Sequence, residues 1–204
     1  VSTANYFWED KTSNEYSEMI VSVTSNKGFY VARYEASADA TGTIAESKRG
    51  QTIWTRVEQT TALTVCRDNE LIENMHLMYG IERDSTLKWL IGNAIISSTL
   101  EGQRKTMELS DIQTSSCTWG NYSDSIGDAG KNNNKRQSAG YSEYWKANNI
   151  YDLAGNVWEW TQEKYSTGHN RSTRGGYCGG SGSERSAAVR FRSAETHTDA
   201  NVRF

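Results

Sequence analysis

The segment Tyr151–Thr161, YDLAGNVWEWT, constrains the fold of this chain more than any other. Trp158 and Trp160 lie two residues apart, and this spacing places both side chains on the same face of a strand. Gly155 and Asn156 come just before them and are the residue types that most easily adopt a positive φ. We therefore predict a tight turn that leads into a strand, with two large aromatic rings buried on one side.

The composition predicts one globular domain, residues 1–204, with an aromatic core. Seven tryptophans and eleven tyrosines supply large apolar surfaces, and 204 residues suffice to bury them beneath long irregular loops. A net charge of −3 gives no reason to expect a nucleic-acid partner. No apolar run in the sequence is long enough for a membrane span. The cellular compartment is left open.

Hydrophobic spacing predicts two helices. One covers residues 59–68, with Thr60 or Thr61 as its cap. The other covers residues 84–91, with Asp84 as its N-cap.

The rest of the chain reads as short strands and loops. We expect strands over 19–24 and 29–35, and the second of these places Arg33 beside Glu35 as an ion pair. Residues 36–49 read as loop, and residues 115–142 read as a long surface loop too polar for the core.

Several motifs together resemble one known family. DLAGNVWEWT is followed by Arg174-Gly175-Gly176, and the closing segment NVRF begins at Asn201; GFYVARYEAS from Gly28 and WGNYSDS from Trp119 fit the same pattern. This arrangement resembles the formylglycine-generating-enzyme (sulfatase-modifying factor) domain, a variant of the C-type lectin fold. The resemblance implies an α+β fold with two helices, short antiparallel strands and long irregular loops.

The resemblance does not extend to the catalytic copper site of those enzymes. They hold copper with two cysteines that lie shortly after the RGG strand and five residues apart, and thiolates suit Cu(I). Here Cys178 follows the RGG motif, but position 183 is a serine. Related iron-dependent enzymes use three histidines, whereas His76, His169 and His197 stand in unrelated contexts. We therefore expect no catalytic residue, no bound metal and no cofactor.

A second branch of the same resemblance is noncatalytic. Variable proteins of diversity-generating retroelements are similar to this chain in carrying DLAGNVWEWT, then RGG, then a C-terminal segment of scattered polar and aromatic residues that binds ligand. The ligand-binding residues implied here are Tyr177, Cys178, Ser183, Glu184, Arg185, Val189, Phe191, His197, Thr198, Asp199 and Asn201.

The sequence thus predicts a noncatalytic, ligand-binding variable protein of a bacterial or phage diversity-generating retroelement. Its expected partner is a macromolecule, protein or glycan, on another cell or surface. Two alternatives stay open: a formylglycine-generating or related metal-dependent oxidase with a degenerate site, and a structural module of a phage tail or surface protein. Asn156 and Glu159 could form a calcium site. The alternative is a turn in which the Asn156 side chain bonds local backbone.

Overall fold

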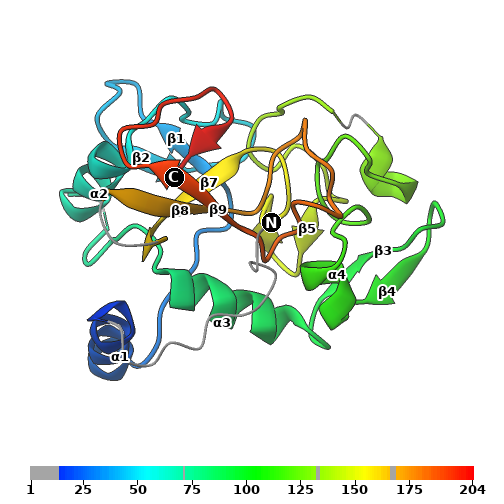
Figure 1. Ribbon diagram of the computed structural model, residues 1–204, viewed down its shortest axis with the longest axis horizontal. Coiled ribbons are helices and arrows are strands. Elements are labelled where there is room, and N and C mark those ends of the chain that lie inside the picture. The colour runs from blue at the N-terminus through cyan, green and yellow to red at the C-terminus, as the bar shows by residue number, and fades with distance from the viewer. Residues whose placement is uncertain (1–13, 71, 132–133, 166–168) are drawn as a thin grey trace.

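The computed structural model describes residues 14–70, 72–131, 134–165 and 169–204. Within these residues the chain combines helices with several small sheets joined by long loops (Figure 1). The helices are α1 (Asn14–Asn26), α2 (Gln59–Arg67), α3 (Gly80–Leu90) and α4 (Leu109–Gln113), with a short 3-10 helix η1 (Gly127–Gly130).

The strands form one four-stranded sheet and three two-stranded ones. The four-stranded sheet has the order β10-β7-β8-β9, and the pairs are β1-β2, β3-β4 and β5-β6. All pairings are antiparallel except that of β10 with β7, which is parallel. The strands are β1 (Ala36–Ala38), β2 (Ala45–Ser47), β3 (Ile95–Ser97), β4 (Arg104–Thr106), β5 (Lys146–Ala147), β6 (Ile150–Tyr151), β7 (Trp158–Lys164), β8 (Asn170–Arg174), β9 (Arg190–Ala194) and β10 (Val202–Arg203).

The predicted turn and strand around the two tryptophans are confirmed. Gly155 and Asn156 have φ of +74° and +61°, and β7 begins two residues later. Trp158 and Trp160 are both buried in an aromatic and aliphatic cluster that includes α2. The indole N–H of Trp160 donates to the Val57 carbonyl at 2.8 Å, so burial leaves this polar group satisfied.

The helix at 59–68 is confirmed, but its predicted cap is wrong. Glu58 precedes α2 in an extended conformation, and Thr60 and Thr61 lie inside the first turn. Ala62 and Cys66 face the core from this helix, as their spacing predicted.

The second helix begins four residues earlier than predicted. Tyr79 precedes α3, and the Glu82 carboxylate accepts the Tyr79 backbone N–H at 3.0 Å. Asp84 is therefore not an N-cap: it lies within the helix, where its buried carboxylate pairs with two arginines of the sheet.

The predicted N-terminal strands are wrong. Residues 19–24 belong to α1, which packs against α3 through the buried side chain of Met19, while Ile20 and Val21 stay exposed. A helix satisfies its own backbone groups, so this β-branched run needs no partner strand. Residues 29–35 form no strand either.

Two predicted loops also contain more structure than expected. Residues 36–49 include the β1-β2 hairpin, whose connection is closed by Asp39 accepting the backbone N–H groups of Thr43 and Ile44 at 3.0 and 2.9 Å. The segment 115–142 is largely irregular, but it is not all surface, because Trp119 and Tyr122 are completely buried in the core.

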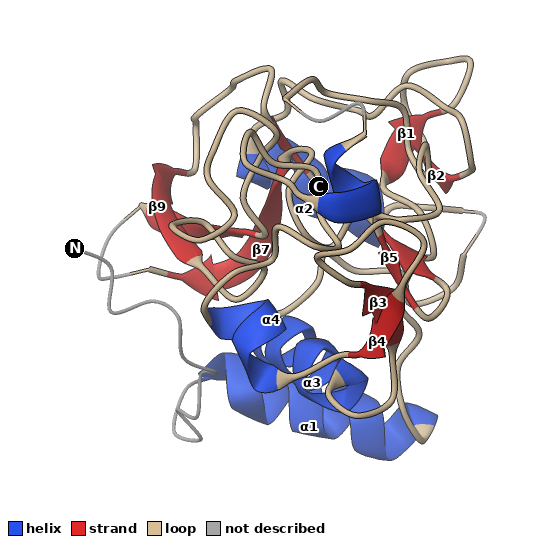
Figure 2. Cartoon of the chain, turned by 90° about the vertical axis from the view of Figure 1, so that its right-hand side faces the viewer, coloured by secondary structure: helices blue, strands red, loops and turns tan. Residues whose placement is uncertain are grey.

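The helices α1 and α3 lie together on one side of the four-stranded sheet in both views (Figures 1 and 2). The helix α2 covers the opposite face, where it packs on Trp160. The sheet thus has α3 on one face and α2 on the other. The candidate site lies on the same face as α2.

Candidate binding site

Side chains alternate across β7, and this alternation gives the four-stranded sheet two chemically different faces. Trp158 and Trp160 point to the face that α2 covers, whereas Glu159 and Glu163 point toward α3. The neighbouring strands keep the alternation, because Trp160 is paired with Thr173 and Glu159 with Arg174.

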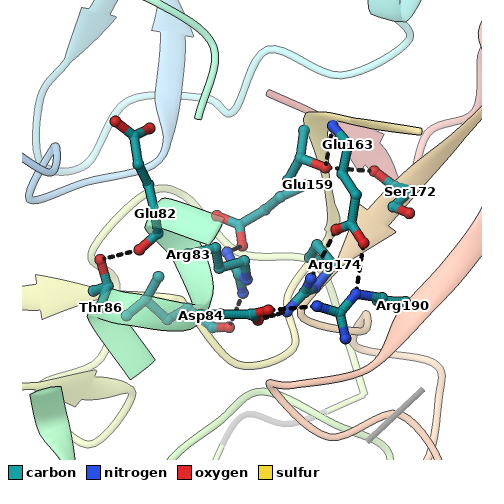
Figure 3. Close-up of polar contacts among 11 residues, drawn as sticks. Glu82, Arg83, Asp84, Thr86, Glu159, Glu163, Ser172, Arg174 and Arg190 are labelled. Atoms are coloured by element: carbon teal, nitrogen blue, oxygen red, sulfur yellow. Dashed lines mark hydrogen bonds and ion pairs between the residues drawn. The ribbon is translucent and has the colours of Figure 1, made fainter. Parts of the chain in front are cut away.

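The face toward α3 carries a buried ion cluster (Figure 3). Arg174 is 0% exposed, contacts Asp84 on α3 and pairs with Glu163 on β7 at 2.9 Å. Arg190 on β9 contacts the same two carboxylates, with its Nε 2.6 Å from Glu163. Two arginines thus balance two carboxylates, and each planar guanidinium bridges the helix and the sheet.

A second ion cluster ties the C-terminus into the sheet. Arg203 on β10 pairs with Glu159 at 2.6 Å and with Glu35 at 2.7 Å, and Arg83 on α3 contacts Glu159 from the other side. Burial raises the pKa of Glu35 well above its usual value, although Arg203 opposes this effect. The predicted ion pair between Arg33 and Glu35 is wrong, because Glu35 pairs with Arg203 instead.

The RGG motif connects the first ion cluster to the segment that follows it. Arg174 is the central cation, and Gly175 and Gly176 continue the chain with φ of +88° and +80°. A Cβ atom at Gly176 would overlap the Arg185 carbonyl oxygen. Glycine is required here because the backbone leaves the sheet in a left-handed conformation and passes directly against the 185 segment.

On the other face, three aromatic rings stack beside one arginine. Trp158 lies 5.1 Å from Phe191 and 6.1 Å from Tyr177 between ring centroids, with nearly parallel planes. The Arg185 guanidinium lies over all three rings, 5.2 Å from Phe191, 5.8 Å from Trp158 and 6.0 Å from Tyr177. Such contacts hold the planar cation against the rings.

These side chains line a surface depression of about 240 Å³, which we call the groove. Its wall toward the sheet is aromatic, and its remaining wall is polar. The lining residues are Trp158, Tyr177, Arg185, Phe191, Ser193, His197, Asp199, Asn201 and Val202.

Six of the eleven side chains expected to bind ligand meet in this groove. They are Tyr177, Arg185, Phe191, His197, Asp199 and Asn201. They span 25 positions of sequence, counted from 177 to 201, and come from β9 and from the irregular segments on either side of it.

The other five lie elsewhere. Val189 and Cys178 are buried, at 4% and 6% exposure, so neither presents a side chain to solvent as expected. Val189 stands just before β9 and packs into the same core cluster as Trp158. Ser183, Glu184 and Thr198 are exposed but do not line the groove.

Three lining residues were missed by the sequence analysis. Trp158 was expected in or beside the core but not among the binding residues, and it also lines the groove. Ser193 is two residues from Phe191 on β9, and this period-two spacing was the signal that could have identified it. Val202 lies at the groove because its strand pairs in parallel with that of Trp158, and no local sequence pattern predicts this pairing.

The residues of the possible calcium site are engaged by protein partners. The Asn156 Oδ1 accepts hydrogen bonds from Asn121 Nδ2 and from the Gln137 backbone N–H, both at 3.0 Å, and its Nδ2 donates to Glu35 at 2.7 Å. Glu159 is held by Arg83 and Arg203. Asn156 therefore organises the turn by linking three segments of the chain.

The cysteines do not fit a two-thiolate copper site. Burial raises the pKa of the Cys178 thiol, and the exposed Ser183 offers a hydroxyl that bonds to Ser181 at 2.8 Å. Cys66, Cys117 and Cys178 are all unpaired and buried. Among the residues that the structure describes, no three His, Cys, Asp or Glu side chains gather as a metal-binding group. Within the same residues, no helix is long and apolar enough to cross a membrane.

Comparison with known proteins places the fold. Residues 99–203 match the model of the sulfatase-modifying factor enzyme 1-like domain. No curated protein matches the chain in sequence. Among solved structures, PvdO from Pseudomonas aeruginosa aligns with a TM-score of 0.51 and 12% identity, over 92% of this chain and 74% of that one. Variable protein 1 of Treponema denticola aligns with a TM-score of 0.48 and 14% identity, over 82% and 73%.

The family match covers just over half of the chain, from the loop before β4 to the last strand. It includes the turn at Asn156, the two tryptophans of β7 and the RGG motif. The expected α+β, C-type lectin-like fold is confirmed, with α1 and α4 in addition to the two helices predicted. The chain belongs to the family of sulfatase-modifying factor enzyme 1-like domains.

Proposed function

We propose that this domain is a noncatalytic ligand-binding protein of the variable-protein type found in bacterial and phage diversity-generating retroelements. In this proposal its C-terminal segment, residues 177–201, forms the binding surface and the groove is the centre of that surface. The observation that carries the proposal is the gathering of six side chains from this segment around one depression.

The way the segment is held supports this role. Arg174 precedes it and Arg203 follows it, and each is buried in an ion cluster. Between them Ala187, Ala188 and Val189 are buried and anchor the middle of the segment. The groove side chains are therefore presented by a fixed backbone, which is how irregular loops carry binding sites on a rigid scaffold.

The chemistry of the groove supports binding over catalysis. Its members are aromatic rings, one guanidinium and a few hydrogen-bonding groups, the residue types that dominate protein interfaces. The copper chemistry of formylglycine-generating enzymes needs two thiolates after the RGG strand, and at those two positions this chain has the buried thiol of Cys178, whose pKa is raised, and the hydroxyl of Ser183.

A pair of displayed libraries tests the proposal. One library varies the six groove residues Tyr177, Arg185, Phe191, His197, Asp199 and Asn201. The control library varies six exposed residues outside the groove: Lys48, Thr60, Glu70, Lys88, Glu101 and Gln103. Both are selected against the same set of purified proteins. We expect equal folded fractions and binders from the groove library alone. A groove library that unfolds, or that gives no more binders than the control, contradicts the proposal.

Two further observations separate the alternatives. A reverse-transcriptase gene beside this gene, with a near-copy of its 3′ end that differs at adenines, would establish the retroelement. Oxidation of a cysteine-containing peptide by the purified protein supplied with copper would instead establish the oxidase. If neither is found and the groove library gives no binders, a structural module becomes the better interpretation.

A further inference from the structure

Within the described part of the chain, the groove contains one cation, Arg185, whose guanidinium has no hydrogen-bond acceptor among the protein side chains. Arg83, Arg174, Arg190 and Arg203 each pair with carboxylates on the other face of the sheet. Among the residues that the structure describes, by contrast, no carboxylate pairs with Arg185 and no side chain accepts a hydrogen bond from its guanidinium. Its guanidinium instead lies beside the three aromatic rings.

The rings fix this guanidinium in place before any ligand arrives. Its central carbon lies between 5.2 and 6.0 Å from the centroids of Phe191, Trp158 and Tyr177. These contacts hold the guanidinium beside the rings, and among the described residues none of its N–H groups donates to a side chain. A pre-oriented arginine fork loses little side-chain entropy on binding, and its geometry matches a carboxylate with two parallel hydrogen bonds.

From this arrangement we propose that the groove binds an acidic side chain, glutamate or aspartate, of a protein ligand, with Arg185 receiving its carboxylate. The proposal rests on the proposed function and names the class of ligand for that same site. In it, the apolar part of the ligand side chain packs against the exposed ring of Phe191, which is 44% exposed.

The charge of the groove favours a carboxylate over a more highly charged anion. Its lining contains one arginine and one carboxylate, that of Asp199, whose Oδ1 accepts the Asn201 backbone N–H at 2.7 Å. One unpaired cation near an existing carboxylate suits a ligand group with a single negative charge. A phosphate monoester carries close to two charges at neutral pH and would be repelled by Asp199.

The size and packing of the groove favour a protein side chain over a sugar. The groove measures about 240 Å³, below the ~300–1,000 Å³ typical of pockets for small molecules. The rings stack on one another and Trp158 is only 6% exposed, so the most open of the three is the single phenyl ring of Phe191, at 44%. Clustered tryptophan, tyrosine and arginine are the usual anchors at the centre of protein interfaces.

Titration with three small probes tests the proposal on the full chain. The probes are the blocked tripeptide Ala-Glu-Ala, its Ala-Gln-Ala counterpart and methyl glucuronide. Binding is followed by NMR through the Arg185 Nε–H and the Trp158 indole N–H signals. We expect the glutamate peptide to shift both signals saturably and the glutamine peptide to bind about tenfold more weakly, because it cannot form a charge-assisted pair.

Two matched variants locate the interaction. Arg185→Lys keeps the charge but removes the fork, and we expect about tenfold weaker binding of the glutamate peptide. Arg192→Lys makes the same change one residue beyond Phe191 on β9, at an exposed position outside the groove, and should leave binding unchanged. Equal losses in the two variants contradict the proposal.

The remaining outcomes separate this inference from the proposed function. If the glutamine peptide or the glucuronide shifts the groove signals as strongly as the glutamate peptide, the inference of an acidic protein side chain is wrong. The proposed binding function is unaffected by that result. If the glutamate peptide produces no saturable shift, the inference is likewise wrong. The binding role is then decided by the library selection alone.

Discussion

The two faces of the four-stranded sheet satisfy their side chains in opposite ways. On the face toward α3, buried arginines and carboxylates complete one another within the fold. On the aromatic face, beside Phe191, one arginine is held by rings and its hydrogen-bonding edge is left for solvent or ligand. The first arrangement tolerates little change, because removing one charge strands another in a dry environment. The outer side chains of the second, such as Phe191 and His197, tolerate change because they are exposed and lie outside the buried core cluster.

Arg174→Met should produce the largest loss of stability. It removes a completely buried cation and leaves Asp84 and Glu163 short of a partner, which costs about 3–5 kcal/mol for a broken buried pair. Urea unfolding measures the loss. Arg192→Met is the matched control, since that side chain is exposed, and should change stability by less than ~0.5 kcal/mol. Similar losses in both variants would mean that the ion cluster does not hold the sheet.

Trp158→Ala should cost somewhat less, about 3 kcal/mol, at the low end of the range for removing a large buried aromatic. The ring contacts the core cluster, but its edge borders the groove, so part of the space left behind opens to water. The variant should also lose the glutamate-peptide shift at Arg185 because the guanidinium loses one stacking partner. Wild-type melting would show that the ring is not part of the core.

The free energy of unfolding should depend on pH through Asp152, a buried carboxyl near Arg203 and Glu159 of the charged face. Burial raises the pKa of Asp152 from 3.8 to about 7, and its Oδ2 accepts the Gly140 N–H at 2.8 Å. The folded state therefore binds this proton more tightly than the unfolded state. Stability contributed by the protonated form is complete below about pH 4 and is lost as the pH rises to about 7.

Asp152→Asn keeps the acceptor for Gly140 and cannot ionise, so it should flatten the fall in stability between pH 4 and pH 7. Unfolding free energies of the wild type and the variant, measured at several pH values, test this. An unchanged slope in Asp152→Asn would assign the pH dependence to other groups.

The smallest effect on stability should come from changing three groove residues together with the neighbouring Glu184. Replacing Glu184, Arg185, Phe191 and His197 together by other polar residues should cost little. Arg185 is half-buried and the other three are exposed, and exposed substitutions usually stay within ~0.5 kcal/mol each. Peptide binding to the groove should nevertheless disappear. Failure of this variant to fold would remove the contrast between the two faces.

Local patterns in the sequence predicted the parts of the fold that depend on neighbouring residues. Residue spacings of two to four predict the turn at Asn156, the strand of Trp158 and Trp160, and the helix that contains Cys66. The helix α1 was missed because its β-branched residues favour a strand when their surroundings are ignored, and packing on α3 overrides that preference.

The ion clusters lie beyond such reasoning because their members are far apart in the chain. Asp84 and Arg190 are separated by 106 positions in the sequence. Glu35 and Arg203, which form an ion pair, are separated even more widely. For the groove, the resemblance identified the segment and six of its lining residues. It could not show which side chains turn inward, so Val189 and Cys178 were placed on a surface that they lie beneath.

The parallel pairing of β10 with β7 has a consequence for the length of the binding segment. Val202 is paired with Trp158, so the end of the segment returns to the sheet beside the strand that supports the groove. Because β9 pairs with β8 and Arg203 holds the end of the segment, the chain from Ala194 to Arg203 is a loop with both ends fixed. For such a loop each doubling of length costs only about 0.6 kcal/mol of closure entropy. Residues inserted in the exposed stretch 196–198 should therefore be accommodated, and the surface can vary in reach and depth as well as in side chains.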